Sequence, residues 1–532
     1  MTDQSRREFL AVSSAVVALA TLGERARAEQ VVERRLARVE GEAARDVAMA
    51  AVQAAREAGA SYADVRVDVD ASQAVSVWQH HAAGSVRYGE RFVYGVRVIA
   101  NGQWGFAGDI EPTVDAAARG ARRAVAQATA NAALRRTPVA LAPAPVVADG
   151  RWATPIELDP FAVSPGEQQE LLQQGVQAAL RVRGIRSAGG TLAFSRTVRT
   201  FASSDGSFIV QTFWFANPSA STSAAAAHDP DLVVSRSLPA LSRVAGGYEV
   251  VRDARLEAGM TEAADAAVRG VQSLARAKPV DVGRYDVVLS ASAMAGLITG
   301  TLGQATGWNR VSGRDASYEG TSFAAPPERA LGHPIASPLV TLIGDRVLKG
   351  GLGTAAWDDE GVSTSTFPLI DQGVLVDYQT TREGAAALDW WYAERGRAAR
   401  SNGCASGGGL TTPREAMPNV VMRPGRTAAR VAELVADVER GILFTDELSG
   451  GMDDTLHTGA WWAPLAYVIR HGKVAEPVRD VGMQFRTQQL WMALDAVGGA
   501  ASAESVGVGT ATVRAVPGRF RGVAITSSGL AV

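Results

Sequence analysis

The chain contains little cysteine and little histidine. Among its 532 residues there are one cysteine, Cys404, and six histidines. A single cysteine excludes an intramolecular disulfide bond and a zinc site built on several thiolates. Any metal centre or nucleophilic site that needs histidine therefore has few positions from which to draw.

A surplus of charge of one sign is also absent. Lys and Arg number 53 and Asp and Glu number 55, which gives a formal net charge of −2. Phosphate recognition needs a concentrated basic surface, so the sequence argues against a nucleic-acid partner. Hydrophobic residues at 47% and charged residues at 20% are typical of a globular chain. The 55 glycines favour many turns and a strand-rich architecture.

The N-terminal apolar run, residues 11–22, is shorter than the ~20 residues that cross a bilayer. It follows Ser5-Arg6-Arg7-Glu8-Phe9-Leu10, which resembles a twin-arginine export motif, and it precedes the cleavage pattern Ala26-Arg27-Ala28. We therefore expect residues 1–28 to be a signal peptide and not a permanent membrane anchor. The mature chain is expected to begin near Glu29 and to be periplasmic.

Changes of hydrophobic period along the chain predict an α+β fold. Helical spacing on either side of strand-like alternation predicts an N-terminal α/β domain over 41–135. The Pro- and Ala-rich residues 136–154 are expected to be a linker, and a second helix–strand alternation predicts a middle domain over 155–280. Short strands and glycine turns predict a β-rich C-terminal domain over 281–525, a sandwich or barrel-like structure with helices near 295–304 and 428–439.

The common catalytic motifs are absent: the sequence contains no GxSxG, SxxK, HExxH or Walker A string. The GxGxxA string at 351–356 lacks the helix and the acidic residue that dinucleotide binding requires, so a glycine turn is the simpler interpretation. His80 and His81 lie between strand-like segments, where neighbouring side chains point to opposite faces. One metal ion cannot easily bind both.

Three groups of segments stand out in order along the chain. They are Tyr94–Ile99 with Asn101–Ala107; Asp358-Asp359-Glu360-Gly361-Val362 with Leu369–Leu375; and Arg440-Gly441-Ile442, Ser449-Gly450-Gly451 and Tyr467–Val474. Together they resemble the TldD/PmbA family of metallopeptidases over about residues 45–500.

The resemblance implies a zinc peptidase with an HExxxH element on a helix after the strand that opens the C-terminal domain. Two imidazoles five positions apart can share a zinc ion if the helix is locally adjusted, and the glutamate deprotonates the bound water. By position, Thr299 and Gln304 replace the histidines and Gly300 replaces the glutamate. The third ligand of the family, a cysteine, has no counterpart in residues 500–532. We therefore expect no bound zinc and no other cofactor.

Other side chains could form a catalytic or metal site at a different place in the chain. Asp453, Asp454 and His457 form a possible ligand set in a glycine-flanked loop, where acidic turn residues are also common. The acidic turn at 358–360 is open to the same two interpretations. Cys404 could be a nucleophile if a histidine lowered its pKa, although the sequence identifies no such histidine.

Two adjacent tryptophan pairs suggest a further binding surface. The pairs Trp390-Trp391 and Trp461-Trp462 fit core or dimer contacts, with an aromatic ligand cleft as the alternative.

Three functional hypotheses follow from these observations. The first is an exported, zinc-lacking subunit that pairs with a zinc-bearing relative in proteolysis of peptides, as the family resemblance implies; without such a relative the chain is expected to be a homodimer. The second is an independent peptidase or amidase that uses the Asp453 loop or Cys404. The third is a cell-envelope protein that binds peptides or sugars through the tryptophan pairs.

Overall fold

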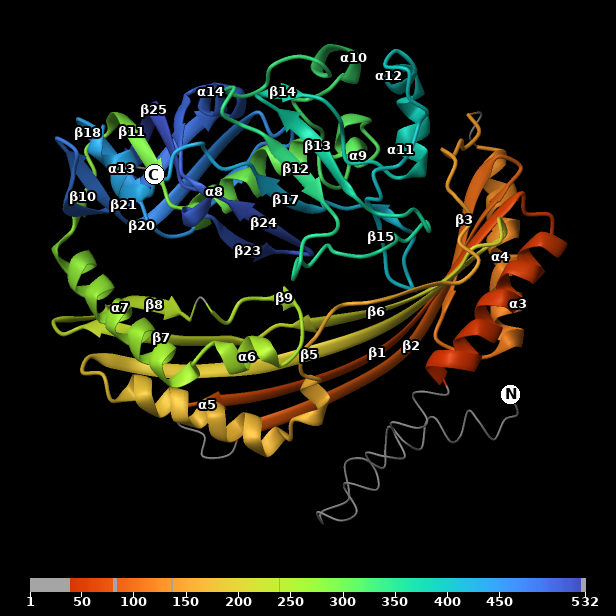
Figure 1. Ribbon diagram of the computed structural model, residues 1–532, viewed down its shortest axis with the longest axis horizontal. Helices are drawn as coiled ribbons and strands as arrows, with labels where there is room; N and C mark the ends of the chain where they lie inside the picture. Colours follow the sequence, from red (N-terminus) through yellow and green to blue (C-terminus); the bar gives the residue numbers. More distant parts are fainter. Residues whose placement is uncertain (1–38, 80–83, 135–136, 239, 528–532) are drawn as a thin grey trace.

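The computed structural model describes residues 39–79, 84–134, 137–238 and 240–527. The expected signal peptide and the His80-His81 pair lie outside these ranges. A long curved sheet forms one layer, and the C-terminal half of the chain lies on one of its faces (Figure 1). Every helix in the described ranges is too short or too polar to span a membrane.

The long sheet has nine strands, with the order β3-β2-β1-β5-β6-β4, while β7 and β8 extend from β5 and β9 pairs with β6. Its strands are β1 (Tyr62–Trp78), β2 (Ser85–Ala100), β3 (Gln103–Asp109), β4 (Gly150–Ala153), β5 (Ile185–Ser203), β6 (Phe208–Ala216), β7 (Ser219–Ala226), β8 (Asp229–Ser237) and β9 (Val244–Ala245). Strands from both sides of residues 136–154 thus share one sheet. The central strands β1 and β5 pair directly and antiparallel.

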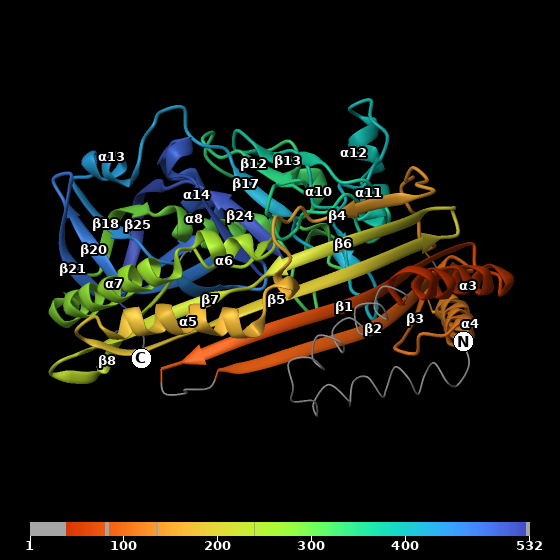
Figure 2. The same ribbon diagram turned by 60° about the horizontal axis from the view of Figure 1, so that its bottom comes forward.

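Helices cover the two ends of this sheet. The π-helical turn η1 (Val39–Ala43), α3 (Ala44–Glu57) and α4 (Val114–Ala132) lie at one end, and α5 (Pro165–Leu180), α6 (Glu249–Asp253) and α7 (Leu256–Arg276) lie towards the other (Figure 2). A short 3-10 turn, η2 (Pro160–Ala162), precedes α5. The buried residues of α3 and α4 are mainly alanines, and these small side chains let both helices lie close to the sheet. Val65, Val67 and Val69 of β1 pack in the same core.

The C-terminal half contains an eight-stranded sheet that closes on itself. Its order is β10-β21-β20-β18-β11-β25-β22, and an additional pairing of β21 with β25 joins the strands β21, β20, β18, β11 and β25 into a ring. These strands are β10 (Lys278–Pro279), β11 (Gly283–Leu289), β18 (Arg440–Phe444), β19 (Ser449–Met452), β20 (Thr458–Arg470), β21 (Lys473–Arg486), β22 (Leu494–Val497) and β25 (Gly518–Ser527). The α+β class with a β-rich, barrel-like C-terminal region is confirmed.

A six-stranded sheet completes this half, in the order β14-β13-β12-β17-β24-β23. Its strands are β12 (Leu342–Asp345), β13 (Thr366–Asp371), β14 (Val374–Leu375), β17 (Asn419–Met422), β23 (Glu504–Val508) and β24 (Ala511–Ala515), and a separate hairpin joins β15 (Ala405–Ser406) to β16 (Arg414–Glu415). The helices are α8 (Ala291–Ile298), η3 (Thr299–Gly303), α9 (Trp308–Val311), α10 (Pro327–Ala330), α11 (Arg382–Ala387), α12 (Asp389–Ala393), α13 (Val431–Ala436), α14 (Thr487–Met492) and η4 (Ala500–Ser502). The largest core of the molecule surrounds α8.

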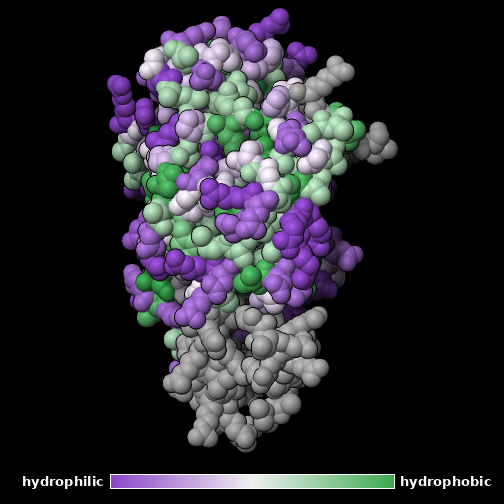
Figure 3. Space-filling view, turned by 90° about the vertical axis from the view of Figure 1, so that its right-hand side faces the viewer, coloured by the Kyte–Doolittle hydropathy of each residue, from purple (hydrophilic) through white to green (hydrophobic). Residues whose placement is uncertain are grey.

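The end of the molecule that carries α3, α4, α11 and α12 has a mixed surface. In the view of that end, hydrophobic residues are scattered among hydrophilic ones (Figure 3). This mixture is typical of protein surface that faces water.

Candidate functional site

The segment at the position of the family's catalytic helix follows β11 directly. The hydroxyl of Ser290 accepts a hydrogen bond from the backbone N–H of Ala293 at 3.2 Å and so begins α8. The helix then widens into a π-helix, η3, over Thr299–Gly303. Hydrogen bonds five residues apart bring positions 299 and 304 onto one face of such a helix. The backbone adjustment that an HExxxH pair requires is therefore present, although the histidines are not.

The indole of Trp461 fills the space beside Gly300, where the family's general base would stand. A Cβ atom on Gly300 would lie 2.4 Å from Cζ2 of Trp461. Trp461 is on β20, is only 7% exposed and belongs to the main core. Because the ring is held there by packing, a glutamate side chain at position 300 has no room.

The two positions that would hold histidines are occupied by neutral side chains with other partners. The Thr299 hydroxyl donates to the carbonyl of Ala295, 2.9 Å away, one turn earlier in the helix. The Gln304 amide oxygen accepts from Nη2 of Arg310 at 3.1 Å. A hydroxyl and an amide are poor zinc ligands, and a guanidinium beside them opposes a cation. These residues do not fit zinc, and no cluster of three His, Cys, Asp or Glu side chains suited to a metal occurs in the described ranges.

The Asp453, Asp454 and His457 loop is the turn of the β19–β20 hairpin. One carboxylate oxygen of Asp453 accepts the backbone N–H of His457 at 2.9 Å, and the other accepts the N–H of Thr458 at 2.9 Å. Partial burial raises the pKa of Asp453, but the hydrogen bonds to its carboxylate outweigh this effect. Together with bonds from the hydroxyls of Thr455 and Thr458, the two backbone bonds lower the pKa of Asp453. The carboxylate is thus used to hold the turn, which favours a structural role over a metal site.

The thiol of Cys404 is fully buried in the main core. Its closest polar contact is a weak one, from Sγ to the carbonyl oxygen of Asn402 at 3.8 Å. Burial raises the pKa of the thiol well above its usual value. A nucleophilic cysteine needs the opposite environment, one that stabilises the thiolate.

The tryptophan pairs contribute mainly to packing. Trp391 and Trp461 are 6% and 7% exposed and both belong to the main core. The Trp391 indole N–H donates to the carbonyl of Val376 at 3.2 Å. Trp390 packs edge-on against Trp391, with ring centroids 5.9 Å apart. One tryptophan of each pair, Trp391 and Trp461, is therefore a core residue, and Trp390 packs against the same core.

The acidic turn at 358–360 joins the C-terminal half to the long sheet and is buried. Asp359 forms an ion pair with Arg199 of β5 at 2.7 Å, and Glu360 forms one with Arg97 of β2 at 3.0 Å. Arg97 also binds Asp64 of β1 at 2.6 Å. Two segments of the family resemblance, one in β2 and one at 358–362, thus meet in space and hold the halves together. Sequence reasoning left this turn open between solvent and metal.

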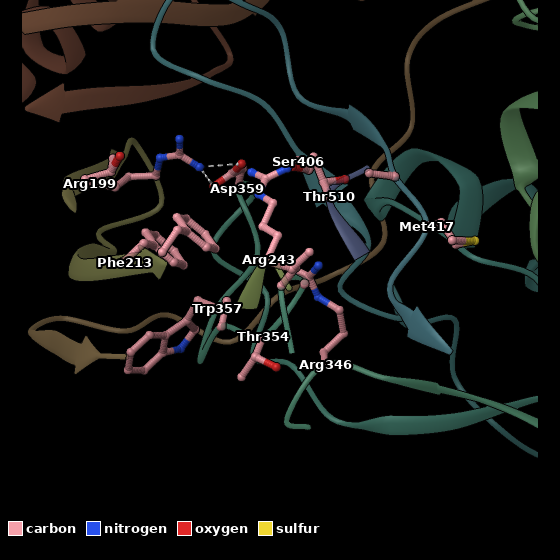
Figure 4. A pocket seen from close by; sticks show the side chains of 16 residues that line it. Arg199, Phe213, Arg243, Arg346, Thr354, Trp357, Asp359, Ser406, Met417 and Thr510 are labelled. Atoms are coloured by element: carbon pink, nitrogen blue, oxygen red, sulfur yellow. Dashed lines mark hydrogen bonds and ion pairs between the residues drawn. The ribbon is translucent and has the colours of Figure 1, made fainter. Parts of the chain in front are cut away.

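A cavity of about 190 Å³ lies between strands β5 and β6 and the C-terminal half. Arg199, Arg243 and Arg346 line it, together with the rings of Phe213 and Phe215 (Figure 4). Met417 lies between the cavity and η3: it lines the cavity, and its Sδ lies 2.8 Å from the place of a Cβ on Gly303. Sequence reasoning missed this site, since isolated arginines carry no pattern.

Comparison with known proteins places the chain in a family. The model of the PmbA/TldA metallopeptidase C-terminal domain matches residues 282–518, and that of PmbA/TldA metallopeptidase domain 1 matches residues 63–132. The chain therefore belongs to the TldD/PmbA family, which confirms the resemblance seen in the sequence.

Individual relatives agree with this assignment. A metalloprotease of Methanothermobacter thermautotrophicus is 25% identical over 82% of this chain and 88% of its own length. The Metalloprotease MJ0996 of Methanocaldococcus jannaschii is 28% identical, over 47% of this chain and half of its own length.

A solved structure, TldE from Thermococcus kodakarensis, superimposes with a TM-score of 0.65 over 90% of this chain and 99% of its own, at 18% identity. A solved protein from Bacteroides thetaiotaomicron gives a TM-score of 0.68 over 91% of this chain and 98% of its own, at 16% identity. At these identities the likeness concerns the fold alone.

Proposed function

We propose that this chain is a zinc-lacking subunit that pairs with a zinc-bearing TldD/PmbA relative in the proteolysis of peptides. The observation that carries the proposal is the contact of Trp461 with Gly300. A general base at position 300 would need the volume that the indole fills. Thr299 and Gln304 have other hydrogen-bond partners, so the chain keeps the family fold without the groups for hydrolysis.

The proposal includes export by the twin-arginine route to the periplasm, on the motif at Arg6 and Arg7. Changing both residues, Arg6→Lys with Arg7→Lys, should leave an unprocessed precursor in the cytoplasm, because the export receptor reads the paired guanidinium groups. Cell fractionation and N-terminal sequencing test this. A chain that begins near Glu29 outside the cytoplasm, in the double variant, would contradict it.

The pairing is tested with the purified mature chain, residues 29–532, and a TldD/PmbA relative from the same genome that retains HExxxH. We expect well under one zinc per chain by elemental analysis, no cleavage of an unfolded peptide by the chain alone, and a heteromeric complex by light scattering. Cleavage should need the relative, and a variant of the relative with Gln for its motif glutamate is the matched control. A monomer, alone and in the mixture, would count against pairing.

Restoration of the motif provides a second test. The triple change Thr299→His, Gly300→Glu and Gln304→His should still give little zinc and little activity, because Trp461 blocks position 300 and no third ligand is present. Stoichiometric zinc in the unmodified chain that is lost on His457→Ala would instead transfer the function to the hairpin loop.

A further inference from the structure

The cavity between the long sheet and the C-terminal half contains a buried cation without an anionic partner. Arg346 is 7% exposed, and its Nε atom has no hydrogen-bond partner. Its guanidinium forms no ion pair with the described residues. A buried guanidinium stays charged, so an unpaired one is costly unless an anion reaches it.

Asp358, a carboxyl group that interacts electrostatically with Arg346, already has hydrogen-bond partners of its own. Burial raises the pKa of Asp358, and the field of Arg346 only partly offsets this. One oxygen of Asp358 accepts the backbone N–H groups of Glu360 and Val362 at 3.0 and 2.9 Å, and the other accepts that of Ala405 at 3.2 Å. Asp358 therefore stabilises its own turn and does not neutralise Arg346 by contact.

The other two arginines of the cavity differ in their partners. Arg199 is held by two carboxylates, Asp68 and Asp359, each at 2.7 Å. Arg243 is exposed and bonds only a neutral carbonyl, that of Gly509, at 2.7 Å. Arg346 on the buried side and Arg243 on the exposed side are thus the two guanidinium groups of the cavity that form no ion pair with the described residues.

An apolar wall lies next to this charge. Phe213 and Phe215 alternate along β6 and so project from the same face of the sheet. Their rings are parallel, with an interplanar angle of 1° and centroids 6.4 Å apart. Trp357 also lines the cavity and lies below Phe213 in the close view (Figure 4). The cavity of about 190 Å³ suits a group the size of one amino-acid residue and not a large cofactor.

We propose that this cavity binds the carboxylate of an amino-acid residue with an apolar side chain, with Arg346 and Arg243 as the anion-binding groups and Phe213 and Phe215 as the apolar wall. Arg346 is kept unpaired because the ligand supplies its partner. The proposal goes beyond the subunit function, since it needs neither zinc nor a second protein.

Calorimetry and intrinsic tryptophan fluorescence on the mature chain test the proposal, with four probes. N-acetyl-L-phenylalanine and the peptide Ala-Ala-Phe should bind, and acetate should bind more weakly because it lacks the apolar part. N-acetyl-L-phenylalaninamide should bind at least tenfold more weakly than the free acid, since it lacks the charge that Arg346 pairs with. Equal binding of the acid and its amide, or binding of neither, would overturn the proposal.

Substitutions separate a binding role from a structural one. Arg346→Met should weaken the binding of N-acetyl-L-phenylalanine tenfold or more, yet leave Tm of the free protein unchanged or raised, because no ion pair is lost. The matched control is Arg423→Met. Arg423 is an exposed arginine that directly follows β17, and its substitution should leave binding unchanged. If Arg346→Met does not fold, Arg346→Lys keeps the charge without the planar fork and should still weaken binding. A large fall in Tm with unchanged binding would show that Arg346 is structural.

Discussion

Replacing Gly300 by alanine should destabilise the protein, although alanine is favoured over glycine in helices by about 1 kcal/mol. The new Cβ would lie 2.4 Å from Cζ2 and 2.6 Å from Cη2 of Trp461. Ordinary contacts between carbon atoms are roughly 3.5–4.0 Å. Forcing one methyl group into a packed core costs about 1–3 kcal/mol, and contacts this short favour the upper part of that range, about 2–3 kcal/mol. After subtraction of the helix preference of about 1 kcal/mol, we expect a net loss of roughly 1–2 kcal/mol.

Whether Gly300→Ala destabilises or stabilises the protein should depend on whether Trp461 is present. In the Trp461→Ala background, which itself should cost about 3–5 kcal/mol, the ring is gone and Gly300→Ala should become stabilising by about 1 kcal/mol. The two substitutions should therefore couple by roughly 2–3 kcal/mol, a size typical of residues in direct contact.

Thermal and urea unfolding of the wild type, the two single variants and the double variant measure this coupling. The fall in Tm for Gly300→Ala alone should be roughly 2–8 °C by the scaling for a domain of 150–250 residues. Gly451→Ala is the matched control, because a Cβ at Gly451 would meet nothing within 4 Å. A stabilising Gly300→Ala in the wild type, or the same effect in both backgrounds, would refute the reasoning.

Three further predictions concern buried and turn-forming charges. Burial raises the pKa of Glu415 from 4.5 to about 8, so its contribution to stability is largest below pH 4.5 and is lost as pH rises through 8; Glu415→Gln should flatten the dependence of Tm on pH across that window. Asp453→Ala should loosen the β19–β20 hairpin and speed amide hydrogen exchange there, while exchange in the long sheet stays unchanged. Arg97→Met leaves Glu360 buried without its cation and Asp64 with Arg66 alone, and it should cost about 3–5 kcal/mol by urea unfolding, part of which adding Glu360→Gln should restore.

The sequence predicts which residues share a face of a strand, but it does not predict which segments pack against that face. Alternation in β1 correctly separates Val65 and Val67 from their charged neighbours, because side chains on a strand point to opposite faces in turn. Both faces are nevertheless buried: Asp64 and Arg66 are fully enclosed. Arg66 donates to the carbonyl oxygens of Asp359 at 3.4 Å and Thr411 at 3.2 Å, which lie 293 and 345 residues later, and no local pattern predicts such contacts.

Helix prediction in the C-terminal half succeeded for two segments and missed the others. The residue patterns around 295–304 and 428–439 indicate helices; α8 with η3 occupies the first place and α13 lies within the second. The helices α9, α10, α11, α12 and α14 have four to six residues each, so they contain too little of the 3.6-residue period to be recognised. The change to a π-helix is likewise invisible in the residue pattern.

The candidate site divides in the same way. Once the family is recognised, the sequence predicts that the zinc ligands are replaced at 299 and 304 and the base at 300. The sequence does not show that Trp461 fills the space beside Gly300, because β20 lies more than 150 residues later in the chain. Arg346 has no signal either: what distinguishes it is burial without a partner, and both properties depend on the fold.

The π-helix persists without the ligands because contacts from outside the helix hold it. The Thr301 hydroxyl donates back to the carbonyl of Leu297 and accepts the indole N–H of Trp491 at 3.0 Å. The Gln379 amide donates to the carbonyl of Gly303. A widened turn frees backbone carbonyls that need partners, and these buried side chains supply them. The π-helical backbone at 299–303 is therefore held by hydrogen bonds from its own side chains and from distant segments, and under the proposed function it is the side chains around it that exclude hydrolysis.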